Sequence, residues 1–572
     1  MPPIPAFGRF TTALKRWSLL IGVAALSACA QLPKDVQRPV SHALASPAET
    51  PLGALAQQRH DAAGARFDSG FLLLDGPQAA YGSRLALVEG ARKTLDLQYY
   101  AIHADASTGR LLRAIRDAAA RGVRVRILID DFHSTGRDAL VLLLGFETNV
   151  EMRLFNPLAG DRDSTFSRLA NSLSEASRVQ QRMHNKLFIA DNAMGVTGGR
   201  NLGDAYFGNA KAGNFVDLDV LAAGPIVQDL SRSFDAYWNN ERSYPVQSLV
   251  TKEELQEMRN RVRPPAGPNG ERPADSGGPT PEQRAFAWDE KPLDLASARF
   301  VWAPAVVMAD KPAKIAPDTT SPDAGAGKAP AMVISQQQDN AGSPRTAALD
   351  ASADLAAGSE TVVEGLLQLI GQARRDLLII SPYFVPGDDM KQAFAAARAR
   401  GVRVRVLTNS LASNDAPVAH VGYARHREEL LAMGVELYEM RSEQAGVGKA
   451  FGSSGSGSGV TGQSRAMLHA KVLVLDGRLL VVGSMNLDLR SQLQNTEVAL
   501  LIQSSELSRI ATSQIETALR EGAWHVESVD GQLTWRAPEG SGLQDSTTEP
   551  DASASLRLLL KLFGPLAPDK LL

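Results

Sequence analysis

Residues 182–201 read RMHNKLFIADNAMGVTGGRN, and residues 467–486 repeat the same frame as MLHAKVLVLDGRLLVVGSMN. Each copy has a histidine, a lysine two positions later and an aspartate five positions after that, followed by a small pair and an asparagine. HxKxxxxD arises by chance at a given position on the order of once in ten thousand or less. Two copies with the same continuation therefore indicate a shared function. The matching residues are His184, Lys186, Asp191, Gly198, Gly199 and Asn201, and then His469, Lys471, Asp476, Gly483, Ser484 and Asn486.

Each copy is predicted to form a β-hairpin. LFIAD and VLVLD are short aliphatic runs closed by turn signals, and MGVT and LLVV then lead into a corner rich in Gly and Ser. Side chains alternate along a strand, so a histidine and a lysine two positions apart project to the same side. An imidazole can be a nucleophile or a general acid, and a lysine with an asparagine can hold an anionic oxygen. Each hairpin is thus expected to offer these three groups to one patch.

The sequence before each hairpin is duplicated as well. ARGVRVRIL at 120–128 returns as ARGVRVRVL at 399–407, a separation of 279 residues. In both halves a strand pattern, an amphipathic helix pattern ending in Gly and a second strand pattern follow one another, which predicts β-α-β units and a parallel sheet. The predicted halves cover 52–250 and 351–536.

Bulk composition sets further limits. A chain of 572 residues is too long for one core, and 44% hydrophobic with 22% charged residues is typical of soluble globular proteins. The formal net charge of −3 gives no overall attraction to nucleic acid or anionic lipid. The single cysteine excludes an intramolecular disulfide, and no Cys/His cluster has zinc spacing.

Residues 1–29 are predicted to be a lipoprotein-type signal peptide. Basic residues precede an apolar run at 17–26, which is shorter than the ~20 residues that span a bilayer. The ending LSAC resembles a bacterial lipoprotein box, which implies a lipid on Cys29; a plain signal peptide with an incidental cysteine is the alternative. Either reading predicts export.

Three further segments lie outside the two halves. Residues 30–51 are predicted to be a tether, and 251–350 a low-complexity insertion or linker with a short ordered patch at 285–304. Residues 537–572 form the C-terminal tail. Its apolar stretch with spaced basic residues at 555–572 is interpreted either as an amphipathic membrane-surface helix or as a tail that packs on the protein.

The two His-Lys-Asp frames resemble the signature of the phospholipase D superfamily, with no motif residue missing. Further stretches, among them LDLQYY, RGVRVRILIDD, FVDLDVLAAGP, SPYFVP and GSMNLDLRSQLQNTEVAL, are similar to bacterial cardiolipin synthases, most of all to the C-type branch. The resemblance runs through most of 65–245 and 360–535. It implies an α/β fold of duplicated phospholipase D-like α-β-α sandwiches, in which two pseudo-symmetric halves share one active site at their interface.

The resemblance also implies roles for single residues. His184 and His469 would face each other across a phosphodiester, with Lys186, Lys471 and the substrate-binding residues Asn201, Asn486 and Ser484 around it; by analogy with the superfamily, His184 is expected to be the nucleophile. Asp217 and Glu497 fit the carboxylates that orient the histidines, with Asp219 as the competing choice in the first half. Asp191 and Asp476 complete the catalytic motifs, but their turn positions favour a structural role. Neither a metal nor another cofactor is required.

The activity implied by the resemblance is cardiolipin synthesis. A phosphatidyl group would pass through a phosphohistidine from phosphatidylethanolamine to phosphatidylglycerol, at a membrane surface of the bacterial cell envelope. Three alternatives remain: a phospholipase D that releases phosphatidic acid, a phosphodiesterase or nuclease of the same superfamily, and a surface lipoprotein with an inactive site. The low net charge and predicted export disfavour nucleic acid, and the intact motifs disfavour an inactive site. The sequence identifies no protein partner and leaves the choice of membrane open.

Overall fold

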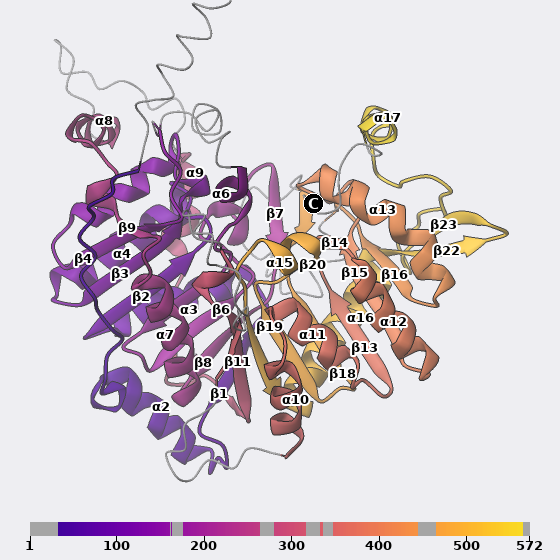
Figure 1. Cartoon of the computed structure of the whole chain (residues 1–572), viewed down its shortest axis with the longest axis horizontal. Helices are drawn as coiled ribbons and strands as arrows, with labels where there is room; N and C mark the ends of the chain where they lie inside the picture. The colour runs from indigo at the N-terminus through magenta and orange to yellow at the C-terminus, as the bar shows by residue number, and fades with distance from the viewer. Residues whose placement is uncertain are drawn as a thin grey trace, which may run out of the picture.

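A computed structural model of the chain describes residues 32–160, 162, 176–262, 279–315, 332–335, 347–443 and 465–563. Two large β-sheets, one for each half, lie side by side in Figure 1 with helices around them. Cys29 and the predicted signal peptide lie outside the described residues, as do the Gly/Ser-rich residues 450–464.

The first sheet has nine strands in the order β10-β1-β8-β6-β5-β2-β3-β4-β9. Its strands are β1 (Gly70–Leu74), β2 (Thr94–Tyr99), β3 (Arg124–Asp130), β4 (Val150–Phe155), β5 (Leu187–Ala190), β6 (Met194–Gly198), β8 (Asp219–Ala223), β9 (Ser243–Pro245) and β10 (Val301–Trp302).

The second sheet has ten strands in the order β12-β11-β21-β19-β18-β13-β15-β16-β22-β23. From β11 to β22 this order matches that of the first sheet from β1 to β9, strand for strand, as the duplication predicts. The strands are β11 (Ala305–Asp310), β12 (Met332–Ile334), β13 (Asp376–Ile380), β15 (Arg403–Asn409), β16 (Glu436–Met440), β18 (Val472–Leu475), β19 (Leu479–Gly483), β21 (Val498–Gln503), β22 (Ala523–Val529) and β23 (Gln532–Arg536).

The helices complete both halves. Those of the first half and its flanks are α2 (Pro51–Ala62), α3 (Pro77–Gly90), α4 (Ala106–Ala120), α6 (Ala176–Gln180), α7 (Pro225–Trp238), α8 (Lys252–Val262) and α9 (Pro281–Asp289). Those of the second are α10 (Ala347–Ala357), α11 (Val362–Ile370), α12 (Asp388–Ala399), α13 (Pro417–Ala432), α15 (Leu489–Leu493), α16 (Ser505–Gly522) and α17 (Ala554–Phe563). Short 3-10 helices are η1 (Pro47–Glu49), η2 (Asp131–His133), η3 (Asp138–Phe146), η5 (Asp204–Tyr206), η6 (Val246–Ser248) and η7 (Pro312–Lys314).

The predicted β-α-β units are present, but the prediction of a parallel sheet is wrong. Strands β2, β3 and β4 are parallel to one another, and so are β13, β15 and β16. The motif hairpins β5–β6 and β18–β19 then join the same sheets in antiparallel pairs. Both sheets are therefore mixed, because a hairpin reverses the chain within the sheet while a helical crossover does not.

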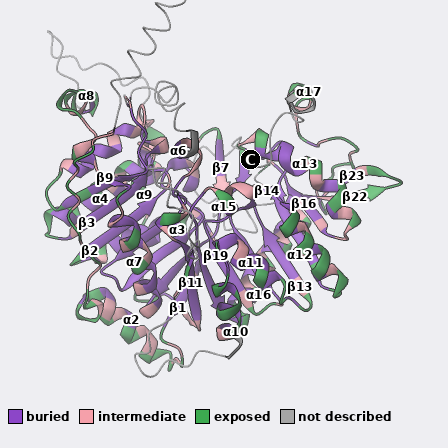
Figure 2. Cartoon of the chain, viewed as in Figure 1, coloured by how far each residue is buried: buried purple, intermediate pink, exposed green. Residues whose placement is uncertain are grey.

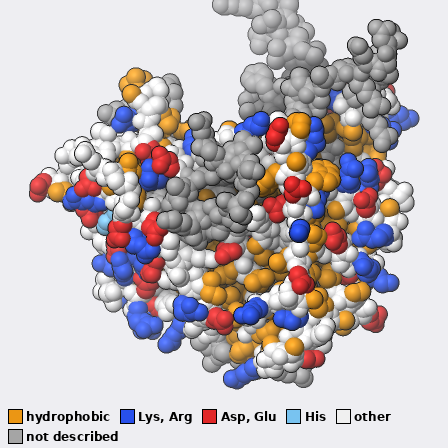
Figure 3. All heavy atoms as spheres, turned by 180° about the vertical axis from the view of Figure 1, so that it is seen from behind, with side chains coloured by type: hydrophobic (Ala, Val, Ile, Leu, Met, Phe, Trp, Pro, Cys, Tyr) orange, Lys and Arg blue, Asp and Glu red, His pale blue; other side chains and the backbone are white. Residues whose placement is uncertain are grey.

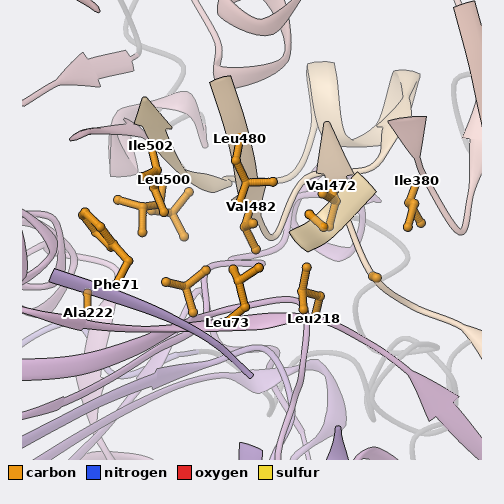
Figure 4. Packing of buried hydrophobic residues seen from close by; sticks show 14 of the residues in the cluster. Phe71, Leu73, Leu218, Ala222, Ile380, Val472, Leu480, Val482, Leu500 and Ile502 are labelled. Carbon is orange, nitrogen blue, oxygen red and sulfur yellow. The ribbon is translucent and has the colours of Figure 1, made fainter. Parts of the chain in front are cut away.

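Three hydrophobic cores hold the molecule together. One lies on the first sheet under α3 and α4, another on the second sheet under α10, α11 and α12. The third is shared: it joins the inner faces of both sheets with α7 and α16. Figure 4 shows Phe71, Leu73 and Leu218 of the first half opposite Val472 and Val482 of the second. Both sheets are covered on both faces, so their central strands are buried in Figure 2, whereas the edge strands β22 and β23 are partly exposed.

The segment between the halves is more than the predicted linker. Strand β10 pairs with β1 at the edge of the first sheet, whereas β11 pairs with β21 in the second and is fully buried. The second half thus begins near residue 305 and not at 351. The run AVVMAD is too short to show its strand character within a segment whose composition is dominated by Pro, Ala, Gly and Asp.

The predicted tether is also partly an ordered strap on the first half. The carbonyl of Pro39 accepts a hydrogen bond from the buried Arg153, and that of Ser41 accepts one from the buried Arg126 at 3.0 Å. Buried guanidinium groups need acceptors, and this segment supplies them. Residues 32–50 therefore include part of the folded domain.

The C-terminal tail contacts the protein, and its role at a membrane surface stays a prediction. Glu549 forms a 2.7 Å ion pair with Arg427 of α13, which fixes the tail to the second half. Beyond it, α17 lies next to α13 at the edge of the molecule (Figure 1), with Leu558 and Leu562 58% and 62% exposed. Among the described residues, no helix has the length and hydropathy needed to cross a bilayer.

Candidate active site

The two motif histidines lie immediately before their hairpins, where the halves meet. The predicted placement of His184 and Lys186 on a strand is wrong, because β5 starts at Leu187; His469 and Lys471 likewise precede β18. The reason is that these residues pair with the other half. The His184 amide donates to Thr496 O at 2.9 Å, and the His469 amide donates to Val216 O at 2.8 Å.

This backbone pairing brings carboxylates across the interface. Strand β17 (Arg465–Leu468), which ends just before His469, runs parallel to β7 (Gly213–Val216), which ends just before Asp217. In the other direction Met183, next to His184, forms a bridge with Thr496, next to Glu497. Each histidine is therefore delivered to the carboxylate of the opposite half.

The histidine–carboxylate pairs are consequently crossed. His184 Nδ1 donates to Glu497 at 3.0 and 3.1 Å, and His469 Nδ1 donates to Asp217 Oδ2 at 2.7 Å. With Nδ1 bound to a carboxylate, Nε2 carries the lone pair of the neutral imidazole. Asp217 and Asp219 are the two candidates for the orienting carboxylate of the first half. Asp217 is hydrogen-bonded to a histidine, whereas Asp219 forms a buried ion pair with Arg84 at 2.9 Å.

Burial and the lysines of both motifs lower the pKa of each motif histidine. Burial is the main cause that lowers the pKa of His184 well below its ordinary value, and the charges of Lys186 and Lys471 add to it. Burial, together with Lys471, lowers the pKa of His469 to about 4. At neutral pH both imidazoles are therefore unprotonated in the free protein, and an anionic substrate raises both pKa values.

The two lysines occupy equivalent positions. Lys186 Nζ donates to His184 O, and Lys471 Nζ to His469 O, each at 2.6 Å. Both side chains are buried, and burial lowers the pKa of Lys186 to about 7 and that of Lys471 to about 8. These ammonium groups are only partly neutralised by the protein, which makes them receptive to an anion.

The supporting carboxylates differ in their charge state. Burial raises the pKa of Glu497 to about 7, although Lys186 and the hydroxyls of Ser484 and Ser491 oppose this. Burial also acts to raise the pKa of Asp217, but the hydrogen bond from His469 outweighs it and the pKa is lowered. The His469–Asp217 pair therefore stabilises an imidazolium better than the His184–Glu497 pair does.

The motif aspartates serve the fold. Asp191 Oδ1 accepts hydrogen bonds from the amides of Lys93 and Thr94 at 2.7 and 2.9 Å, and Asp476 Oδ1 accepts them from Arg375 and Asp376 at 2.7 and 3.0 Å. Each lies at the end of its strand opposite the histidine. This agrees with the structural interpretation of their turn positions.

The predicted substrate-binding residues divide into two kinds. Asn201 is held by Tyr206 and the Ala101 amide, while Asn486 is buried and its Oδ1 has no hydrogen-bond partner among the described residues. Ser484 instead donates to Glu497 Oε2 at 2.5 Å. The Ser484 hydroxyl thus orients the carboxylate of Glu497, and its contact with substrate stays a prediction.

Several residues that support the site were not predicted from the sequence. Asp130 accepts from the Met183 amide, and Asn409 both donates to and accepts from the backbone of Leu468, so each fixes the residue before a histidine. Asp130 and Asn409 are the last residues of the repeated strands VRVRILID and VRVRVLTN. Their equivalent positions in the two copies could have identified them from the sequence. Tyr100 and Tyr206 contact His184 and His469 edge-on, at 5.2 and 5.3 Å between ring centroids.

Charge stabilisation in the site comes from lysines and amides. Among the described residues, no group of three or more His, Cys, Asp or Glu side chains is arranged as a metal site. Two ammonium groups beside two neutral imidazoles suit the binding and in-line displacement of a phosphodiester.

Comparison with known proteins gives a consistent result. The family described as "Cardiolipin synthase, PLD-like domain" matches residues 85–238 and 366–519. The chain is 34% identical to cardiolipin synthase C of Escherichia coli (strain K12), over 86% of this chain and 94% of that protein. It is 30% identical to an uncharacterized protein of Helicobacter pylori (strain ATCC 700392 / 26695), over 93% of this chain and 94% of the relative.

A solved structure has the same fold. Phosphatidylserine synthase of Haemophilus influenzae Rd KW20 superimposes with a TM-score of 0.50 at 13% identity, covering 90% of this chain and 98% of that one. At this identity the likeness concerns the fold alone.

Proposed function

We propose, on the premise that this chain belongs to the cardiolipin synthase family of PLD-like domain proteins, that it moves a phosphatidyl group from one phospholipid to a hydroxyl of another. The chain is a phosphatidyltransferase of the phospholipase D superfamily. The observation that carries the mechanism is the crossed pairing of His184 with Glu497 and of His469 with Asp217, beside two buried lysines.

In the first step His184 Nε2 attacks the phosphorus of the donor lipid. A P–N bond forms, the bond to the head-group oxygen breaks, and His469 protonates that oxygen. The lysines neutralise the non-bridging oxygens. We assign His184 as the nucleophile because burial and the less ionised Glu497 keep its imidazole unprotonated, so that its lone pair is available. Asp217 supports the imidazolium form of His469, which suits a general acid.

In the second step the acceptor hydroxyl replaces the leaving group. His469, now neutral, takes the proton of the acceptor hydroxyl. The hydroxyl oxygen attacks phosphorus, and the P–N bond to His184 breaks. One phosphodiester is exchanged for another, so the reaction needs no external energy source. We propose phosphatidylethanolamine as donor and phosphatidylglycerol as acceptor, which gives cardiolipin and ethanolamine.

A nucleic-acid substrate is not supported. A nuclease of this superfamily is expected to present a basic track for the phosphate backbone. On the face shown in Figure 3, acidic and basic side chains are interspersed.

We further propose that the enzyme works at a membrane of the bacterial cell envelope. The signal-like residues 1–29 with Cys29 and the exposed leucines of α17 support this location. Fractionation of cells that express the wild type or Cys29→Ser tests the anchor. Recovery of both proteins in the same membrane fraction, in equal amounts, would count against lipidation.

The reaction itself is tested with purified protein in vesicles of phosphatidylethanolamine and phosphatidylglycerol, with products identified by mass spectrometry. We expect cardiolipin and ethanolamine from the wild type and no turnover above background from His184→Ala or His469→Ala. The matched control is His525→Ala, a histidine on β22 that is remote from the motif residues in sequence and partly exposed. Phosphatidic acid without cardiolipin would identify a hydrolase instead.

A further inference from the structure

One cation near His184 forms no side-chain hydrogen bond or ion pair with any residue that the structure describes. Arg490 lies on α15 and is half-buried, and no described residue accepts a hydrogen bond from its guanidinium or forms an ion pair with it. The other cations nearby are engaged: Lys186 and Lys471 by the carbonyls of their histidines, and Arg182 by Asp130. The charge of Asp488, on the same turn of chain, attracts Arg490 without forming an ion pair with it, so the half-buried guanidinium keeps donors for an anionic ligand.

Helix α15 places Arg490 next to the His184–Glu497 pair. The carboxylate of Asp488 accepts from the Ser491 amide at 2.6 Å and caps the helix, and Ser491 Oγ donates to Glu497 Oε1 at 2.9 Å. Residue 490 is therefore held one position from a group that touches the carboxylate of His184.

The charge of Arg490 acts on three residues of the first half. Burial is the largest cause of the lowered pKa values of His184 and His133, and the positive charge of Arg490 contributes to both. Burial raises the pKa of Tyr100 to about 12, and Arg490 opposes this rise. All three residues belong to the first half, so Arg490 lies near the interface where Ser491 and Glu497 meet His184.

Only one of the two equivalent positions beside the motifs has a cation. Arg490 comes four residues after Asn486, and the residue four positions after Asn201 is Ala205. A cation present on one side only can distinguish the two substrates of a transfer reaction from each other.

Transfer between two phospholipids places two phosphates in the site. The reacting phosphate of the donor faces Lys186 and Lys471. An acceptor phospholipid brings a second phosphodiester with its own negative charge, whereas water or a simple alcohol brings none. Arginine suits such a group because its planar fork can hold two phosphate oxygens at once.

We propose that Arg490 binds the non-reacting phosphate of the acceptor phospholipid and thereby selects a phospholipid hydroxyl over water or a neutral alcohol. This assignment rests on the proposed phosphatidyl transfer. It names the residue that decides the acceptor class, separately from the histidines and lysines that carry out the displacement.

The test uses full-length enzyme with phosphatidylethanolamine as donor and two small acceptors, glycerol and glycerol phosphate, which both offer a primary hydroxyl and differ in the phosphate. Phosphatidylglycerol is a third acceptor. We expect Arg490→Gln to lower kcat/KM about tenfold or more for the two phosphate-bearing acceptors, mainly through KM, and to leave glycerol within about twofold. Arg490→Lys should recover part of the loss.

The matched control is Arg478→Gln, an exposed arginine at the turn of the second hairpin, opposite to the histidine end. Thermal unfolding of each variant verifies the fold. Equal loss with all three acceptors would assign Arg490 to the reacting phosphate, and no loss would remove it from the site; either result overturns the proposal. A wild type that makes phosphatidic acid but no cardiolipin would instead overturn the proposed function, and this assignment with it.

Discussion

At the scale of single residues, the two histidine–carboxylate pairs are built differently. A Cβ at Gly199 would lie 2.3 Å from Asp217 Oδ1, so no side chain fits beside the shorter carboxylate. The equivalent position in the other half, Ser484, has a hydroxyl that donates to the longer Glu497. Gly199 thus accompanies the shorter Asp217, and Ser484 accompanies the longer Glu497. These paired differences make a nearly symmetric site chemically asymmetric.

The first prediction separates two neighbouring carboxylates. Asp217→Asn removes the charge that stabilises the His469 imidazolium, so kcat should fall on the order of 100- to 10,000-fold, by analogy with other histidine–carboxylate pairs. The midpoint of thermal unfolding should change little. Steady-state kinetics and thermal unfolding of the purified variant measure both.

Asp219→Asn is the matched comparison. It breaks the buried contacts of Asp219 with Arg84 and Arg200, so the free energy of unfolding should fall by about 3–5 kcal/mol. The folded enzyme should keep most of its kcat. Reversed phenotypes for the two variants would show that the orienting role had been given to the wrong aspartate.

The second prediction concerns pH. Lys186 and Lys471 must be protonated to neutralise phosphate, and their pKa values are lowered to about 7 and about 8 by burial. As pH rises through this range the charge is lost, so kcat/KM, which reports the free enzyme, should fall on the alkaline side. Substrate anion raises both pKa values, so kcat should fall at a higher pH than kcat/KM.

Lys186→Arg tests this assignment, since a guanidinium stays charged. The alkaline fall in kcat/KM should move up by about one pH unit, to the value set by Lys471. Lys211→Arg, at an exposed position, is the control. An unchanged alkaline limb in Lys186→Arg would exclude the lysine as its cause.

At the scale of secondary-structure elements, each motif hairpin is fixed at both ends. The histidine end is tied to the opposite half, and the turn end is tied to its own half by the motif aspartate. Asp191 and Asp476 both have a positive φ, 52° and 54°, which the turn requires and which Asp tolerates better than most residues. The conserved spacing between lysine and aspartate in the two copies is thus the length of one strand.

The third prediction follows from the amides that these carboxylates bind. Asp191 is fully buried, and Asp191→Ala leaves the amides of Lys93 and Thr94 without their acceptor, which should lower the free energy of unfolding by about 2–4 kcal/mol. Asp476→Ala should cost about half as much, because Arg374 and Arg375 are exposed and their amides can turn to water. Denaturant unfolding measures both values.

Activity per folded molecule should be retained in both variants. A loss of kcat greater than the loss of folded protein would indicate that the aspartates take part in proton transfer.

At the scale of the whole molecule, the halves are joined by a common core and by exchanged strands. Val220 and Phe71 of the first sheet belong to the same hydrophobic cluster as Leu480 and Leu500 of the second. Each fully buried side chain of this kind contributes about 1.5–3 kcal/mol relative to exposure. Separation of the halves would expose this surface and also divide both histidine–carboxylate pairs.

The fourth prediction is that neither half functions alone. Fragments 32–304 and 305–563, cut between β10 and β11, should be largely insoluble when expressed separately and should regain phosphatidyl transfer when co-expressed. Soluble yield and cardiolipin formation measure the outcome. A soluble and active single fragment would contradict a shared site.

The sequence by itself determined the elements whose signals are local. The repeat of His-x-Lys and its Asp located both hairpins, and VRVRIL with VRVRVL located the parallel strands, because strand alternation and turn chemistry depend on neighbouring residues. The types of catalytic group, and the candidates Asp217 and Glu497, followed from the same stretches and from their resemblance to the superfamily.

Only the tertiary structure decided which groups meet. The bonds from His184 to Glu497 and from His469 to Asp217 join residues separated by 313 and 252 positions, and no local pattern encodes such a pairing. The same holds for β11, which belongs to the second sheet because β21 offers it an edge. Contacts of this kind arise when two apolar sheet faces pack together, and that packing is a property of the whole chain.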